Sequence, residues 1–342
     1  MKSIRIAGLI LLFVTAGAVP ARADASAHHI YLVMPFANVA ENPSLDWLST
    51  GLALSLGEFL RGAGAQVIDD EMRAALLEAH GIPPGADLTL ASVLQLGRTM
   101  RARPAGPQPD HTLVGTFNIT DGELTLRARW IHLQREYAGP WHQQEGRLGD
   151  LLEVHARLAR DLAEEIELPR PMRDEQRAGA EAFGDPPLLA FESYCRGMAE
   201  TDTKERLKLL RQAVNEFPGY HRAAYQAAAL LAKTARWNDA ALMLDKAAAD
   251  PHPYRYDYFM LKAIIAMEQH HPGIAAQAAL DASEVHNTAD AQILLCRARL
   301  AGGDRAAARA AFDRAAAINP DNPELDNLRA ALSAAGSGDA VR

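Results

Sequence analysis

The C-terminal half of the chain repeats itself, and this repeat limits the possible folds more than any other feature of the sequence. From about residue 187 onward, small residues recur at spacings of 34, 35 and 33 residues, at Ala213, Ala247, Ala282 and Ala315. The same spacing holds three positions earlier, at Leu210, Leu244, Ala279 and Phe312. A period of 34 residues predicts pairs of antiparallel helices stacked in a row, because one pair alone cannot bury its apolar face.

This period is typical of the tetratricopeptide repeat (TPR). The last unit shows it most clearly, since Cys296 takes the small position of a first helix and Pro320 ends the second. We expect about four TPR-like units and a capping helix over residues 187–334, because a terminal repeat needs a polar outer face. The capping helix is expected at about 323–334, and a loose tail at 335–342.

The N-terminus has the pattern of a secretory signal peptide. Lys2 and Arg5 supply the positive start, residues 6–18 form an apolar run, and residues 21–23 read Ala-Arg-Ala, a small-x-small cleavage site. The apolar run is shorter than the about 20 residues that a membrane-spanning helix needs, so we expect residues 1–23 to be a signal peptide that is cleaved off. A retained membrane anchor is the alternative.

Export of the chain constrains its partners and its cysteines. Cleavage removes three basic residues and no acidic ones, so the formal net charge goes from −8 to −11, with 32 basic against 43 acidic residues. Such a charge argues against nucleic acid or anionic lipid as the main partner. No cysteine lies near the cleavage site, which argues against a lipid-anchored lipoprotein and for the periplasm. Cys195 and Cys296 lie about three repeats apart, so we expect them to be unpaired packing residues.

Residues 28–168 alternate between strand-like and helix-like stretches and predict a small mixed β-sheet with packed helices. The expected order is β-α-β-α-α-β-β-β-α, with strands at 30–36, 66–69, 112–118, 123–133 and about 141–147, and helices at 45–62, 71–79, 89–101 and 151–166. Ser44 is the expected N-cap of the first helix, and Asp121-Gly122 predicts a hairpin turn. The proline-containing stretch 169–186 is the expected linker.

Several residues of this region match a known family. They are Pro35-Phe36, Asn38, Leu48, Gly51, Leu52 and Leu56, then "AQVIDD" at 65–70, "LVGTF" at 113–117, "LTLRARWIHL" at 124–133, and Trp141. On these residues the region resembles the TolB amino-terminal-like domain, which precedes TPRs in many bacterial proteins. "AFESYCRGM" at 190–198 looks like the usual start of those repeats. The resemblance implies a binding or assembly role with no chemistry attached. The chain departs from the family in a longer loop at 101–110 and in "REYAGP" at 135–140.

No group of residues has the spacing of a catalytic, cofactor or metal site. The loop after the first strand, "PFANVAENPS", lacks the glycines that let backbone N–H groups reach a phosphate. The twelve histidines are scattered, and we expect His155 to be a partly exposed surface residue. Asp69, Asp70 and Glu71 fall where a helix begins, so helix capping is their expected role. We therefore expect no catalytic residue, no cofactor, no metal and no enzyme.

The concave surface of the helical repeats is the expected binding site, because first helices of TPR units line a groove for an extended segment. Six side chains are predicted to face it: Arg222, Tyr225, Lys233, Tyr258, Lys262 and Arg297. Four of the six are basic in an acidic protein, which suits an acidic segment or a C-terminal carboxylate.

The sequence thus predicts an α+β domain followed by an all-α domain: a small mixed sheet with packed helices, then a TPR-like solenoid. The expected function is an exported, non-enzymatic adaptor or scaffold of the bacterial envelope that binds another envelope protein. One alternative is an accessory component of an envelope secretion or assembly machine whose α/β domain oligomerises. Another is an enzyme with an unrecognised site, which a catalytic pocket between the domains, lined by histidines and carboxylates, would favour.

Overall fold

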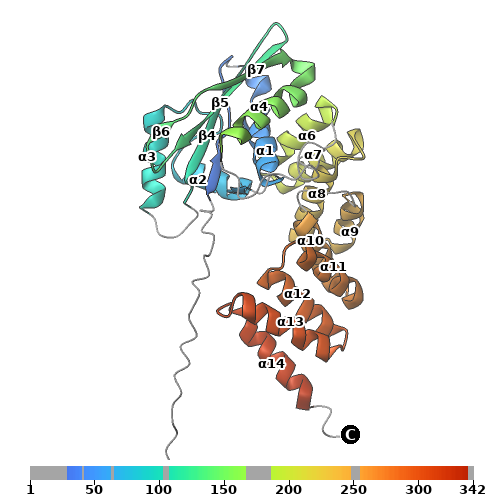
Figure 1. Cartoon of the computed structure of the whole chain (residues 1–342). Coiled ribbons are helices and arrows are strands. Elements are labelled where there is room, and N and C mark those ends of the chain that lie inside the picture. The colour runs from blue at the N-terminus through green and yellow to red at the C-terminus, as the bar shows by residue number, and fades with distance from the viewer. Residues whose placement is uncertain are drawn as a thin grey trace, which may run out of the picture.

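The computed structural model describes residues 29–40, 42–62, 65–102, 108–166, 186–247 and 255–337. The predicted signal peptide, the predicted linker up to residue 185 and the last five residues of the predicted tail lie outside these ranges. An α/β part is followed by a curved row of helices that leads away from it (Figure 1).

The α/β part is built on one mixed sheet with the strand order β3-β1-β4-β5-β6. Two further strands continue it, since β2 pairs with β4 beyond the end of β1, and β7 pairs with β5 beyond β6. The pairs β1–β3, β1–β4 and β2–β4 are parallel, and the pairs made by β5 are antiparallel. The strands are β1 (Ile30–Val33), β2 (Ala37–Asn38), β3 (Gln66–Val67), β4 (His111–Thr120), β5 (Glu123–His132), β6 (Tyr137–Ala138) and β7 (His142–Arg147).

Among the described residues, four helices cover the two faces of this sheet, as the alternating pattern predicts. One face packs against α1 (Trp47–Gly62) and α4 (Leu151–Glu165), around Trp130 and Phe117. The other packs against α2 (Asp70–Ala79) and α3 (Leu90–Arg101), around Ile131. The predicted mixed sheet with packed helices is confirmed.

Two local predictions are wrong. The strand predicted at 30–36 stops at Val33 and resumes as β2, because the chain bends so that the Phe36 N–H donates to Ser49 O of α1, at 3.0 Å. Ser44 does not cap α1. It lies in a short 3-10 helix, Pro43–Leu45, which Asn42 caps by accepting from the Ser44 N–H at 3.1 Å.

Two predicted turns have the expected geometry. Asp121 and Gly122 join β4 to β5 with φ of 53° and 81°, and positive φ at both positions is what a two-residue hairpin turn needs. Asp69 caps α2, because its side chain accepts from the Met72 N–H at 2.7 Å.

Nine helices form the described part of the C-terminal region. Neighbours in sequence pack together in turn, and the predicted repeat alanines are buried at these contacts because they let the helices approach closely. The helix predicted at 323–334 continues to Ser337, into the predicted tail. The bounds are α6 (Leu188–Ala199), α7 (Thr203–Glu216), α8 (His221–Lys233), α9 (Trp237–Lys246), α10 (Arg255–Glu268), α11 (Pro272–Val285), α12 (Ala289–Ala301), α13 (Arg305–Ile318) and α14 (Glu324–Ser337).

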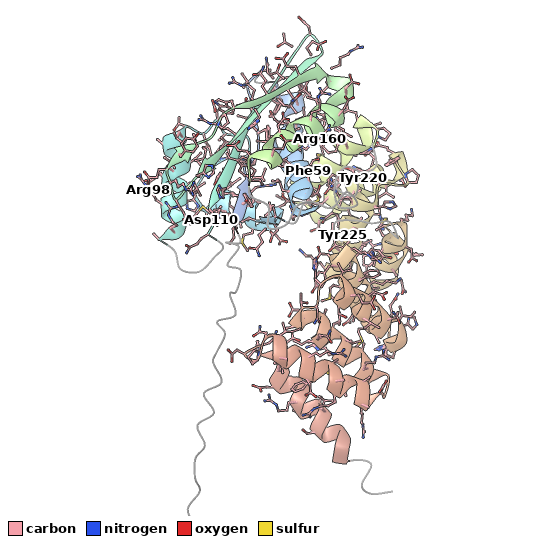
Figure 2. The ribbon with its side chains drawn as sticks, in the orientation of Figure 1. Phe59, Arg98, Asp110, Arg160, Tyr220 and Tyr225 are labelled. Carbon is pink, nitrogen blue, oxygen red and sulfur yellow. The ribbon has the colours of Figure 1, made fainter. Side chains whose placement is uncertain are left out.

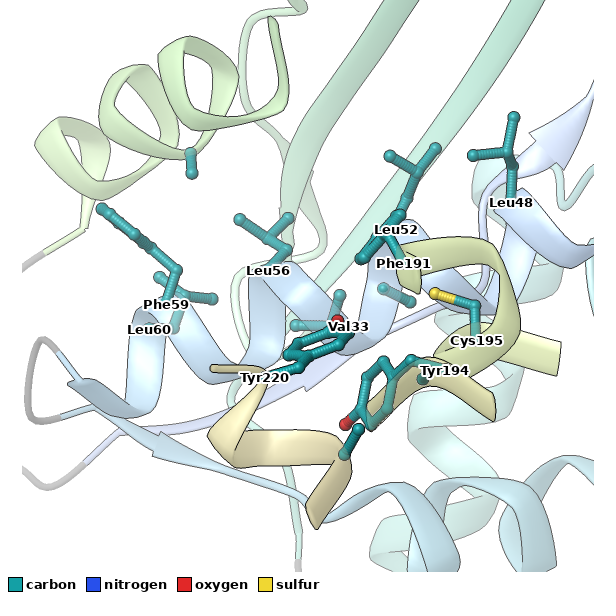
Figure 3. Packing of buried hydrophobic residues seen from close by; sticks show 14 of the residues in the cluster. Val33, Leu48, Leu52, Leu56, Phe59, Leu60, Phe191, Tyr194, Cys195 and Tyr220 are labelled. Carbon is teal, nitrogen blue, oxygen red and sulfur yellow. The ribbon is translucent and has the colours of Figure 1, made fainter. Parts of the chain in front are cut away.

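The α/β part and the first helices share one hydrophobic core. Phe191 and Cys195 of α6 lie against α1, next to Leu52 (Figure 3). The approach is close because α1 carries Gly51 at the contact, where an added Cβ would lie 2.6 Å from the Cys195 sulfur. The helical row is therefore packed against α1 as well as connected to the α/β part through the chain.

Candidate partner-binding site

Arg222 is buried, which corrects its prediction as a groove residue. Its side chain is 6% exposed and forms an ion pair with Glu58 of α1, whose side chain is 1% exposed. The Tyr194 hydroxyl donates to the other carboxylate oxygen of Glu58, at 3.2 Å. Arg222 therefore joins the two parts of the chain and offers no accessible charge to a partner.

Two further predicted residues lie close to the same junction. Lys233 donates to Glu71 of α2, at 3.1 Å, and both side chains are exposed. Tyr225 lies at the junction (Figure 2) and is half-buried, and burial raises the pKa of its hydroxyl. Asp257 of α10 adds to this shift, because its negative charge disfavours the phenolate.

The remaining three predicted residues lie further along the row. Tyr258 and Lys262 share α10, with the Lys262 ammonium 5.9 Å from the Tyr258 ring centroid. Arg297 of α12 forms an ion pair with Glu324 of α14, at 2.8 Å, and its side chain is 47% exposed. Because α10 contacts both α8 and α12, these residues lie on successive helices of one row.

The sequence does not predict which acidic residues pair with these cations. For Glu58 the sequence does contain an indication of a buried ion pair. It is the one acidic residue in the apolar run "LALSLGEFL", and a lone charge in a buried helix needs a partner. Glu71 and Glu324 carry no such signal, since acidic residues in the first turn of a helix are common.

His155 is also placed differently from its prediction. It is 5% exposed on α4 and its Nε2 lies 3.2 Å from Leu52 O of α1. Burial lowers its pKa to about 4, helped by the positive charge of Arg222 and opposed by the hydrogen bond. A polar residue on an amphipathic helix is usually exposed, and here the neighbouring α1 supplies a backbone acceptor.

Three histidines that lie apart in the sequence come together at one end of the sheet. The His111 ring centroid lies 4.9 Å from that of His29 and 4.5 Å from that of His132. Burial and these neighbouring imidazoles lower the pKa of His111 to about 4. Within the described residues, no group of three His, Cys, Asp or Glu side chains is arranged to hold a metal ion.

No protein-family model matches the chain, and no curated protein matches its sequence. Similar solved structures include the LpoB C-terminal domain from Salmonella enterica, with 11% identity and a TM-score of 0.25, covering 36% of this chain and 87% of that one. The same domain from Escherichia coli has 12% identity and a TM-score of 0.25, and the match covers 35% of this chain and 82% of that one. Lipoprotein GNA1162 from Neisseria meningitidis has 15% identity and a TM-score of 0.30, and the match covers 40% of this chain and 99% of that one.

These similarities assign the chain to no family. The TolB-like resemblance and the TPR interpretation of the helices stay predictions. In the part of the chain that the structure describes, none of the helices has the length and apolar character to cross a membrane.

Proposed function

We propose that the protein is a non-enzymatic adaptor of the bacterial cell envelope whose helical part binds a segment of another envelope protein. In this proposal the α/β part is a TolB-like domain and the helices from α6 onward are TPR-like units. The signal-peptide pattern of residues 1–23 supports export to the periplasm. The observation that carries the proposal is the row α8, α10 and α12, in which each helix contacts the next.

A row of helices suits binding because it presents side chains from several repeats along one surface. Tyr258 and Lys262 on α10 offer an aromatic ring beside a cation. Arg297 lies on the next helix of the row, and its bond to Glu324 is exposed, so a carboxylate of the partner can replace Glu324 at little cost. The surface therefore fits an acidic segment.

Site-specific photo-crosslinking in cells tests this proposal. A crosslinking amino acid replaces Tyr258 on the first helix of its unit, or Leu242 on α9, the second helix of its unit, where the side chain is 67% exposed. We expect a discrete crosslinked envelope protein from position 258 only, and its loss when Lys262→Glu and Arg297→Glu are added. Equal products from both positions, or products that survive both substitutions, contradict binding along the row of first helices.

A further inference from the structure

The α/β part carries a second charged surface, separate from the helical row. On β5, Arg127 and Arg129 stand two residues apart and so point to the same face of the sheet. The Trp141 ring lies against both, with its centroid 5.0 Å from the guanidinium carbon of Arg127 and 4.4 Å from that of Arg129. We call these three residues the arginine–tryptophan patch.

This patch lies on a part of the sheet against which no helix of the described residues packs. The packed side of the same face ends at Ile131 and Val114, which contact α2 and α3. Arg129, which pairs with Val114, is half-buried, and Arg127 beyond it is exposed. Trp141 is 40% exposed, although a tryptophan in a folded domain usually buries more of its surface. The patch is thus open to a partner.

Neither arginine has a carboxylate partner among the described residues. The nearby acid on the same face, Glu145 of β7, accepts from the Gln143 side chain at 2.7 Å. The Arg129 Nε is closed to solvent and finds no hydrogen-bond acceptor in the described part of the chain. A guanidinium packed against an aromatic ring keeps its N–H donors in one plane, ready for a bidentate carboxylate. The missing element of the patch is therefore an acceptor with negative charge.

We propose that the arginine–tryptophan patch binds an acidic segment of a partner protein in extended conformation. Alternate residues of an extended chain lie about 6.8 Å apart on one side, the same spacing that separates Arg127 and Arg129 along β5. Two carboxylates at alternate positions therefore match two guanidinium groups. Two cations in a chain of net charge −8 are a small footprint for a nucleic acid or an anionic membrane, which needs an extensive basic surface.

Fluorescence anisotropy with a labelled, end-blocked peptide of alternating Glu and Thr, about ten residues long, tests the proposal. The full-length mature protein is titrated at low salt and again at about 0.3 M salt, because exposed charge pairs weaken with screening. We expect saturable binding that Arg127→Gln with Arg129→Gln weakens by at least about tenfold. The matched control replaces Arg135 and Arg160, two exposed arginines outside the patch (Arg160 is labelled on α4 in Figure 2), with Gln and keeps the affinity.

The remaining arms identify the source of the negative charge. A peptide of alternating Gln and Thr should not bind, and vesicles of phosphatidylglycerol should not compete with the Glu peptide. Circular dichroism of the double variant confirms that its fold is unchanged. No saturable binding of the Glu peptide, equal binding by the double variant, or preferential binding to the vesicles overturns the proposal. Because the crosslinking positions on α9 and α10 lie outside this patch, its failure leaves the binding role of the helical row standing.

Discussion

Glu58 on α1 and Arg222 on α8 form an ion pair that is closed to solvent and joins the α/β part of the chain to its helical part. The cost of removing two charges from water is recovered only if the pair and its remaining hydrogen bonds are complete. Tyr194 supplies one of these bonds through its hydroxyl. The orientation of the helical row relative to the sheet therefore depends on a small polar cluster inside an apolar interface.

Removing one member of this pair should cost far more than removing both. Arg222→Met leaves the Glu58 carboxylate buried without its cation, and we expect the free energy of unfolding to fall by about 3–5 kcal/mol. Glu58→Gln together with Arg222→Met keeps an oxygen acceptor for Tyr194 and should recover most of that loss. Urea denaturation of Arg222→Met, of Glu58→Gln alone and of the double variant measures the difference.

The exposed ion pair across the same junction provides the control. Lys233→Met breaks the bond to Glu71, and we expect a loss of at most about 1 kcal/mol, because both groups stay hydrated. If the double variant at Glu58 and Arg222 loses the sum of the two single losses, the buried pair has no coupling and this account of the junction is wrong.

The close contact between α1 and α6 gives a second prediction. Gly51→Ala places a Cβ 2.6 Å from the Cys195 sulfur and 3.1 Å from its Cβ, so one of the two helices has to move. We expect a loss of about 1–3 kcal/mol in the free energy of unfolding, which Cys195→Ala recovers in part by removing the sulfur. Gly149→Ala is the matched control, because an added Cβ there meets no atom within 4 Å. Equal stability of the two alanine variants contradicts the close contact.

The sequence predicts most of the elements of the α/β part because each has a local signal. The stripe of leucines on α1, the Asp121-Gly122 turn and the acidic cap at Asp69 are all decided within a few residues, and all three are confirmed. The two-residue strands β2 and β6 escape such reasoning, because they exist only through pairing with β4 and β5.

The candidate site is predicted less well, for a related reason. Periodicity shows which helix face Arg222 occupies, but a helix in this stack has a neighbour on more than one side. Whether that face meets solvent or α1 depends on how the α/β part docks, which no local pattern encodes. The sequence places Arg127, Arg129 and Trp141 in two predicted strands and in the family resemblance, but their stacking needs the register of β5 against β7.

The two thiols should be unreactive in the folded protein. Cys195 and Cys296 are free and buried, as their predicted place in the helical repeats requires. Burial raises the pKa of both, so neither forms the reactive thiolate at neutral pH. Ellman's reagent should find no thiol in the native protein and two after unfolding. Ala306→Cys, at an exposed position on α13, should react at once and serves as the control. A missing thiol after unfolding without reductant would reveal a disulfide and contradict this arrangement.

Stability should decrease as the pH falls through the range set by His155. Its imidazole is buried between α4 and α1, and burial lowers its pKa in the folded protein to about 4, whereas an unfolded histidine has its ordinary value of 6.5. Above pH 6.5 neither state binds the proton. Below it the unfolded chain binds the proton first, so the free energy of unfolding falls between pH 6.5 and pH 4, by on the order of 3 kcal/mol from this group.

His155→Gln tests the assignment, because the glutamine amide keeps an N–H donor for Leu52 O and has no titration. We expect urea denaturation at several pH values to show a flatter pH dependence in this variant, with the remaining slope reduced again by His111→Gln, since the pKa of His111 is also lowered to about 4. A slope in His155→Gln equal to that of the wild type would show that the loss of stability in acid arises from other titrating groups, and would contradict a buried, neutral His155 between α4 and α1.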